Sequence, residues 1–177
     1  VFSPSELNSI SVNIISDVNK ITTKFNKFSI IYAPGHTLDH IVFCDHKNNL
    51  LFVGDVLFRL GCGRVFEGTL EQMQNSLHEL SNLPDRMLVY CGHEYTLNNL
   101  KFLEHIFKKN KILESVKNDI ISDLDSKKRS IPFYLGDEKK CNPFLNQKCE
   151  MALELRDKNN YSDFEFFRYL REEKDSF

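Results

Sequence analysis

The amino-acid sequence predicts an α/β protein of the α+β kind, with mixed strands and helices over residues 1–110 and helices over residues 111–177. Short β-branched and aromatic runs end at glycine, proline or polar residues, which is typical of strands. Apolar residues elsewhere recur at helical spacing behind residues that cap helices. After residue 110 the strand-like runs stop, so we predict two domains that divide there.

Four runs predict strands, at 28–33, 41–44, 50–53 and 87–91. A polar turn separates the second and third runs, so these two are expected to form a hairpin. The fourth run is apolar throughout, which is typical of a buried strand. Residues 57–68 predict an irregular loop, whereas residues 1–26 carry no pattern that defines an element.

Helices are predicted from their caps and from apolar spacing. The first and the last helix open with sequences of capping-box form, Thr69-x-x-Gln72 and Ser162-x-x-Glu165. A second helix follows Thr96, and a third ends in the charged run 127–129. Prolines at 132 and 143 predict that residues 131–145 are extended.

Charge and composition exclude several classes of protein. The chain has 23 basic and 25 acidic residues and a net charge of −2, so no global field attracts nucleic acid or an anionic membrane. The longest uninterrupted apolar run, 87–91, is too short for a transmembrane helix or the core of a signal peptide. We therefore expect no nucleic-acid partner and no membrane partner.

The five cysteines are odd in number, and no two of them form a Cys-x-x-Cys pair. This argues against a disulfide framework and against a cysteine-rich zinc site. Free thiols fit a reducing compartment, which predicts a cytoplasmic protein. A mitochondrial location after removal of a transit peptide is the alternative.

Three side chains that suit metal binding follow predicted strands in the same setting. His36, Asp55 and His93 each come directly after a glycine at the carboxyl end of an apolar strand. Such ends meet at one edge of a sheet that is layered with helices, and ligand sites tend to lie there. A single histidine in this place is more often structural, but three acceptable ligands favour a site for zinc, iron or manganese. His40 is expected to support these ligands from behind as a hydrogen-bond donor.

Longer segments extend this pattern to a known family. The chain contains, in order, His36-Thr37-x-x-His40, Gly54-Asp55, the loop 61–69, His93-Glu94-Tyr95-Thr96, the stretch 142–145 and Leu170-Arg171-x-x-Lys174. Together these segments closely resemble glyoxalase II, the hydroxyacylglutathione hydrolase family of the metallo-β-lactamase superfamily. The first two indicate only the superfamily, whereas the loop, the run at 93–96 and the final basic pair are specific for the family. The resemblance runs from about residue 28 to the end.

The resemblance implies a metallo-β-lactamase-type αβ/βα sandwich, followed by a helical substrate-binding domain at 111–177. It also implies two divalent metal ions, zinc in the first place, with iron or manganese as alternatives. His36 would bind one ion and His93 the other, and Asp55 would bridge both and orient the hydroxide that attacks the substrate. The family's His-x-His-x-Asp-His signature, with four further ligands, does not occur in these 177 residues. We therefore expect a sandwich that is incomplete on its amino-terminal side.

The implied activity is hydrolysis of the thioester S-D-lactoylglutathione to D-lactate and glutathione, the second step of methylglyoxal detoxification. Arg171 and Lys174 are three residues apart on the last helix and would bind the glycine carboxylate of glutathione. If the resemblance is set aside, the acidic neighbours of this pair favour a solvated helix end over a binding site. Arg64, Phe66 and Tyr95 would line the rest of the substrate site.

Two alternatives stay open at this point. One is another activity on the same fold, such as that of a persulfide dioxygenase with one iron, against which the long helical tail argues. The other is a catalytically impaired fragment or an interaction module, because half of the ligands are missing. With two protein ligands for each ion, we expect the chain alone to bind metal weakly, to hydrolyse the thioester poorly and to aggregate.

Overall fold

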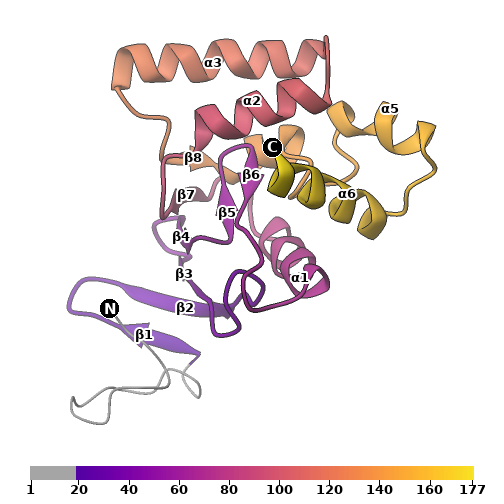
Figure 1. Ribbon diagram of the computed structural model, residues 1–177. Helices are drawn as coiled ribbons and strands as arrows, with labels where there is room; N and C mark the ends of the chain where they lie inside the picture. The colour runs from indigo at the N-terminus through magenta and orange to yellow at the C-terminus, as the bar shows by residue number, and fades with distance from the viewer. Residues whose placement is uncertain (1–18) are drawn as a thin grey trace.

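The structure, a computed structural model, describes residues 19–177 and contains a six-stranded mixed sheet (Figure 1). Its strands lie in the order β1-β2-β3-β4-β7-β8. Their bounds are β1 Lys20–Thr22, β2 Lys27–Tyr32, β3 Ile41–Asp45, β4 Leu50–Gly54, β7 Leu88–Cys91 and β8 Phe133–Tyr134. The four predicted strands are confirmed as β2, β3, β4 and β7, with ends that differ by no more than one residue.

Three strands of this sheet run in the same direction. β2 and β4 both pair antiparallel with β3, and β4 pairs parallel with β7. The carboxyl ends of β2, β4 and β7 therefore lie at one edge of the sheet. The predicted hairpin is confirmed as β3–β4, and its turn includes Asn49 in the left-handed conformation, with φ of 55°.

The described part of the chain contains six helices. Their bounds are α1 Leu70–Ser81, α2 Thr96–Ile106, α3 Lys111–Lys127, α4 Leu135–Cys141, α5 Glu150–Lys158 and α6 Asp163–Ser176. Both predicted capping boxes are present, one at Thr69 before α1 and one at Ser162 before α6. No helix of residues 19–177 is long and apolar enough to cross a membrane.

The predictions for two connecting segments were wrong, and one helix was missed. Residues 131–145 are not extended throughout, because α4 fits between Pro132 and Pro143, neither of which lies inside it. The loop 57–68 contains a short hairpin, β5 Leu57–Phe58 and β6 Gly61–Cys62. Helix α5 was not predicted; its first residue follows Cys149, which makes no side-chain cap. Residues 1–18, the larger part of the stretch without a predicted element, lie outside the described residues.

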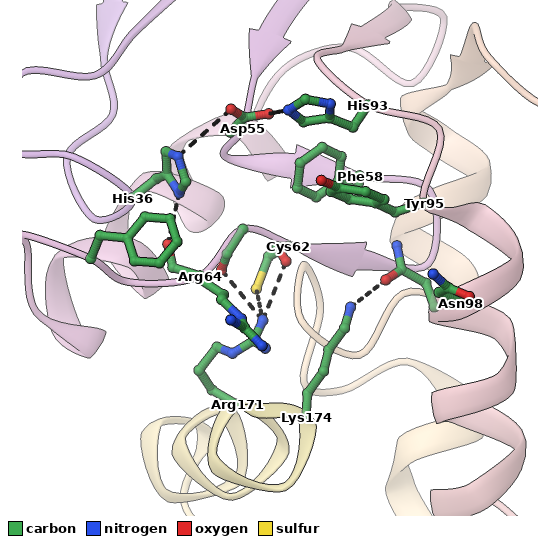
Figure 2. A pocket seen from close by; sticks show the side chains of 13 residues that line it. His36, Asp55, Phe58, Cys62, Arg64, His93, Tyr95, Asn98, Arg171 and Lys174 are labelled. Carbon is green, nitrogen blue, oxygen red and sulfur yellow. Dashed lines mark hydrogen bonds and ion pairs between the residues drawn. The ribbon is translucent and has the colours of Figure 1, made fainter. Parts of the chain in front are cut away.

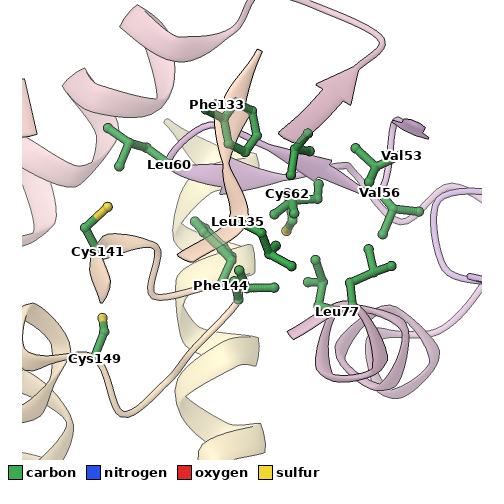
Figure 3. Close-up of a cluster of buried hydrophobic side chains, with 14 of the residues drawn as sticks. Val53, Val56, Leu60, Cys62, Leu77, Phe133, Leu135, Cys141, Phe144 and Cys149 are labelled. Atoms are coloured by element: carbon green, nitrogen blue, oxygen red, sulfur yellow. The ribbon is translucent and has the colours of Figure 1, made fainter. Parts of the chain in front are cut away.

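One hydrophobic core joins the sheet to the helices (Figure 3). Val53 of β4 and Leu77 of α1 belong to the same buried cluster as Phe133, Leu135 and Phe144 from the carboxyl-terminal part. The cluster therefore spans the division that we predicted at residue 110. Burial of this continuous apolar surface is the main force that holds the helices against the sheet.

The other face of the sheet is aromatic and half exposed. The register places Phe43, Phe52 and Tyr90 side by side on this face, with Phe28 packed edge-on against the first two. Phe52 stacks on Tyr90 with ring centroids 5.1 Å apart, yet 36% of its surface is exposed. A face of this kind favours association between proteins.

We expect the 177-residue chain to associate as its concentration rises, because this aromatic face is apolar over several strands. Phe52→Glu should shift the average mass measured by light scattering toward that of the monomer. Glu71→Phe replaces an acidic residue with an aromatic one at an exposed position of α1. It is the control that shows the effect of a single aromatic ring outside this face. A wild-type chain that stays monomeric at all concentrations would contradict the expectation.

Candidate active site

The three predicted metal ligands meet at one edge of the sheet (Figure 2). His36 follows β2, Asp55 follows β4 and His93 follows β7. The carboxylate lies between the two imidazoles: His36 Nε2 is 3.6 Å from Asp55 Oδ2, and His93 Nε2 is 3.5 Å from Asp55 Oδ1. The strand directions therefore bring the three side chains together as predicted.

Glycines make this close approach possible. A Cβ atom on Gly92 would lie only 2.5 Å from Asp55 Oδ1, so no larger residue fits there without displacing the carboxylate. Gly54 has φ of +52°, in the left-handed region that glycine adopts at little cost. The two glycines thus explain why ligands in this chain follow glycine at the ends of β4 and β7.

His36 is oriented by the loop after β6. Its Nδ1 lies 2.9 Å from the backbone oxygen of Arg64. Because a carbonyl oxygen only accepts, Nδ1 carries the proton and the lone pair of Nε2 is left on the side of Asp55. This is the tautomer that a metal ligand bound through Nε2 requires.

His40 supports Asp55 in a different way from the one we predicted. Its Nε2 lies 3.2 Å from the backbone N–H of Asp55 and accepts a hydrogen bond from it, so His40 is an acceptor here and not a donor. The reason is that the group it faces is itself a donor. Burial, and after it the charge of His36, lower the pKa of His40, which favours the neutral ring that can accept.

The side chains fit a divalent metal in kind but not in number. Two imidazoles and a carboxylate suit zinc, iron or manganese, and Asp55 Oδ1 is buried without a hydrogen-bond partner. Within residues 19–177, however, no group of three His, Cys, Asp or Glu side chains is placed to hold one ion. His36 with Asp55, and Asp55 with His93, form two half-sites of two donors each, whereas catalytic zinc has three protein ligands.

A cavity of about 460 Å³ lies in front of these half-sites. Figure 2 shows Arg171 and Lys174 reaching into it from α6, across the cavity from Asp55. Arg64 is a third cation of the lining and is 61% exposed. The structure thus brings the predicted basic residues and the predicted metal ligands into one cavity.

Lys174 is a partly buried cation of this cavity. Its Nζ donates to Asn99 Oδ1 and lies 5.2 Å from the centre of the Phe144 ring. Burial lowers the pKa of Lys174 to about 8, so the amine is charged at neutral pH but loses its charge a little above it. An anionic ligand would favour the charged form.

The guanidinium of Arg171 contacts other groups of the protein rather than the open part of the cavity. Only 2% of its surface is exposed, and its guanidinium donates to the backbone oxygens of Cys62 and Gly63, each at 3.3 Å. It also pairs with Asp175 at 2.9 Å. These contacts hold the loop after β6 against α6, and the predicted contact of Arg171 with a substrate carboxylate stays a prediction.

Aromatic rings border the cavity. Tyr95 stacks on His93 with centroids 5.0 Å apart, and Phe58 packs edge-on against Tyr95. Phe66 lies 5.0 Å from the ring of His36 and is 67% exposed. The predicted Tyr95 and Phe66 are thus present in the lining, each beside one of the two histidines.

Five further residues of the lining were not among the predicted site residues: Phe58, Cys62, Gly63, Asn98 and Asn99. Asn99 lies four residues after Tyr95, so the helical spacing that places both on one side of α2 was a signal for it. Cys62 lines the cavity behind the guanidinium of Arg171, which lies 3.7 Å from its sulfur atom. Only its position between two glycines marked it in the sequence.

Comparisons with known proteins agree with this geometry. The metallo-beta-lactamase superfamily matches residues 13–93, and the hydroxyacylglutathione hydrolase C-terminus matches residues 94–177. The hydroxyacylglutathione hydrolase of Pseudomonas savastanoi pv. phaseolicola is 41% identical over 91% of this chain and 64% of its own length. That of Pectobacterium atrosepticum is 37% identical over 100% of this chain and 71% of its own length. The crystal structure of the BLEG-1 B3 metallo-beta-lactamase has a TM-score of 0.51 at 23% identity, over 75% of this chain and 47% of that one.

The fold and the donor set define the class of protein first: a metallo-β-lactamase fold, in a superfamily that implies binding of divalent metal. Within this class, the chain belongs to the hydroxyacylglutathione hydrolase family. It spans 64% and 71% of the lengths of the two relatives described. The carboxyl-terminal family match begins at residue 94 and includes α2, and our division at residue 110 stays a prediction.

Proposed function

We propose that this chain supplies the substrate cavity and part of the metal centre of an enzyme that hydrolyses S-D-lactoylglutathione to D-lactate and glutathione. One observation carries the proposal: a single cavity has Asp55 and two histidines on one side and three cations across from them. Glutathione has two carboxylates that cations can bind. Its thioester would then lie near the histidines. The proposed location is the cytoplasm, with mitochondria as the alternative.

The cations of the chain would bind and orient the substrate. Lys174, at neutral pH, and Arg64 present positive charge to the cavity, and the unpaired Nε atom of Arg171 adds a buried donor. The hydroxyl of Tyr95 is a further donor beside His93. The contacts of the three cations are remote from the thioester bond, so they are expected to act on binding rather than on the chemical step.

The residues on the opposite side of the cavity from the cations would hold the metal. Divalent ions bound by His36, Asp55 and His93, zinc by preference and iron or manganese otherwise, would polarise the carbonyl oxygen and lower the pKa of a water molecule. His36 keeps its Nε2 lone pair toward the centre because the Arg64 carbonyl holds the proton on Nδ1. The leaving thiolate has a pKa of about 8.5 and departs without a strong general acid. Water adds to the acyl carbon, and the carbon–sulfur bond breaks.

A second candidate function follows from the half-sites. Because each has two donors, a catalytically impaired chain that acts as an interaction module fits the described residues as well. A persulfide dioxygenase-like activity has no particular observation in its favour. The number of bound metal ions and the reaction that is catalysed together distinguish the hydrolase, the dioxygenase and the interaction module.

The test compares the 177-residue chain with a hybrid enzyme, in which this chain follows the amino-terminal segment of the Pectobacterium relative, where the family resemblance implies the His-x-His-x-Asp-His signature. We expect the zinc-loaded hybrid to bind two ions and to release glutathione from S-D-lactoylglutathione, and the chain alone to do neither efficiently. Oxygen uptake with glutathione persulfide in place of hydrolysis would support the dioxygenase. A hybrid with two ions and no turnover would support the interaction module.

Lys174→Ala in the hybrid should raise KM for the glutathione thioester about tenfold and leave kcat nearly unchanged, because a remote carboxylate contact is equally strong in ground and transition states. In the unsubstituted hybrid, KM should rise as the pH passes about 8, where the Lys174 amine loses its proton. The Ala variant should lack this rise. Lys101→Ala, an exposed lysine on α2, is the matched control. A fall in kcat at constant KM would contradict the role of Lys174 in binding.

A further inference from the structure

The β5–β6 hairpin and the residues that follow it contact both candidate metal-binding histidines. We call residues 57–64, which comprise β5, β6 and the two residues after them, the site hairpin. Near its beginning, the ring of Phe58 lies 6.3 Å from the ring of His93. At its end, the backbone oxygen of Arg64 accepts from His36 Nδ1 at 2.9 Å. The conformation of the site hairpin therefore affects the positions of both histidine rings.

The turn of the site hairpin is held from outside the cavity. Leu60, in the turn, is fully buried and has φ of 61°, a left-handed conformation that is unfavourable for a side chain of this size. Its backbone N–H donates to Glu138 Oε2 at 2.7 Å. Glu138 belongs to α4 and is not part of the cavity lining. A buried carboxylate thus fixes the backbone at its least favourable point.

Asn142, directly after α4, completes the support. Its Nδ2 lies 3.3 Å from the oxygen of Phe58, 3.1 Å from the oxygen of Gly61 and 3.0 Å from Glu138 Oε2, and it donates toward all three. Its Oδ1 accepts from the backbone N–H of Phe144, which fixes the orientation of the amide. Both sides of the turn are therefore tied to one buried pair of side chains.

Burial of this pair is unfavourable by itself. Glu138 has 2% of its surface exposed and Asn142 none, and burial raises the pKa of Glu138 to about 7. Apolar residues of similar size would fill this space without the desolvation penalty of a carboxylate. What the polar pair provides, and an apolar pair would not, is an acceptor for Leu60 and a donor for the two carbonyl oxygens of the hairpin.

We propose that Glu138 and Asn142 are positioning residues for the metal centre: they fix the turn of the site hairpin, whose Arg64 carbonyl sets the tautomer of His36 and whose Phe58 ring bounds His93. The inference rests on the proposed function only in treating the two histidines as metal ligands. Its central prediction concerns the metal-free chain and does not require hydrolysis. A failure of this positioning role can therefore be distinguished from a failure of the proposed hydrolase function.

The experiment follows the imidazole rings by long-range ¹H–¹⁵N correlation spectra of the metal-free 177-residue chain at a pH well above the ordinary imidazole pKa, with Phe52→Glu as the common background that limits association. The chain with no further substitution should show His36 with its proton on Nδ1. Glu138→Leu, similar in size but without an acceptor, should lose this signature. Glu138→Gln, whose amide oxygen can still accept from Leu60, should keep it. In the hybrid enzyme, the Leu variant should also bind zinc about tenfold more weakly than the Gln variant.

Two controls keep the proposal falsifiable. Glu154→Leu makes the same chemical change at an exposed position of α5 and should leave the His36 signal intact, and the helix residues His78 and His105 are internal references in every spectrum. A folded Glu138→Leu chain with an unchanged His36 signal would overturn the proposal. If the Leu variant does not fold, Glu138→Asp, which shortens the reach of the carboxylate, takes its place. Failure of both to fold, beside a normal Gln variant, would make Glu138 a determinant of global stability and would also overturn the local role.

Discussion

Asp55→Ala should lower thioester hydrolysis by the hybrid enzyme about a thousandfold, or roughly 4 kcal/mol in activation free energy. Of the three candidate ligands in the described chain, Asp55 is the one whose carboxylate faces both histidines, at 3.6 Å on one side and 3.5 Å on the other. Its loss removes one donor from each half-site, so both ions would lose affinity and alignment together. His36→Ala, by contrast, removes a donor from one half-site.

The effect of Asp55→Ala is measured as kcat together with the zinc content of the purified protein. Asp39→Ala is the matched control, because Asp39 is an exposed aspartate near the site whose carboxylate accepts from Thr37. The control should keep both activity and metal. If the Asp55→Ala enzyme held two ions and retained more than about a tenth of its activity, a bridging role for Asp55 would be untenable.

The parts of the molecule that could be predicted from the sequence are those that depend on local chemistry. Strands appeared where apolar runs stop at glycine or at polar turns, and the caps at Thr69 and Ser162 fixed two helix starts. The meeting of His36, Asp55 and His93 followed from strand direction, because a ligand after each of three parallel-running strands must lie at one edge. These inferences required no knowledge of distant contacts.

The remaining features depend on contacts between segments that are far apart in the sequence. That Glu138 would accept from Leu60, 78 residues away, has no local signal. The same holds for Arg171: spacing on the last helix placed it beside Lys174, but only the packing of α6 on the loop after β6 shows that its guanidinium is used by the backbone of Cys62 and Gly63. Arg171 and Lys174 look equivalent in the sequence, but in the structure Arg171 contacts the backbone of the loop and Lys174 contacts the side chain of Asn99.

Because Arg171 contacts the backbone of the loop, Arg171→Ala is expected to destabilise the protein, in addition to any effect on substrate binding. We expect a loss of about 3 kcal/mol in the free energy of unfolding, because two buried carbonyl oxygens lose their donor and a cavity is left. For a chain of this size that corresponds to a fall of about 10 °C in Tm. The ion pair with Asp175 adds little, since Asp175 is half exposed. Thermal unfolding of the 177-residue chain measures the effect.

The two neighbours of Arg171 on the last helix provide the comparison. Arg168→Ala removes an exposed guanidinium that lies over the ring of Phe164, and it should change Tm by no more than about 2 °C. Lys174→Ala should act chiefly on KM, because its Nζ contacts a side chain of the cavity wall and no backbone group of the loop. If Arg171→Ala left Tm unchanged and raised only KM, the guanidinium would be a ligand for the substrate alone, and its contacts with the loop would contribute nothing to stability. If Tm falls and the activity that remains in the folded fraction shows an altered KM as well, the same side chain both shapes the loop and binds the substrate that the loop surrounds.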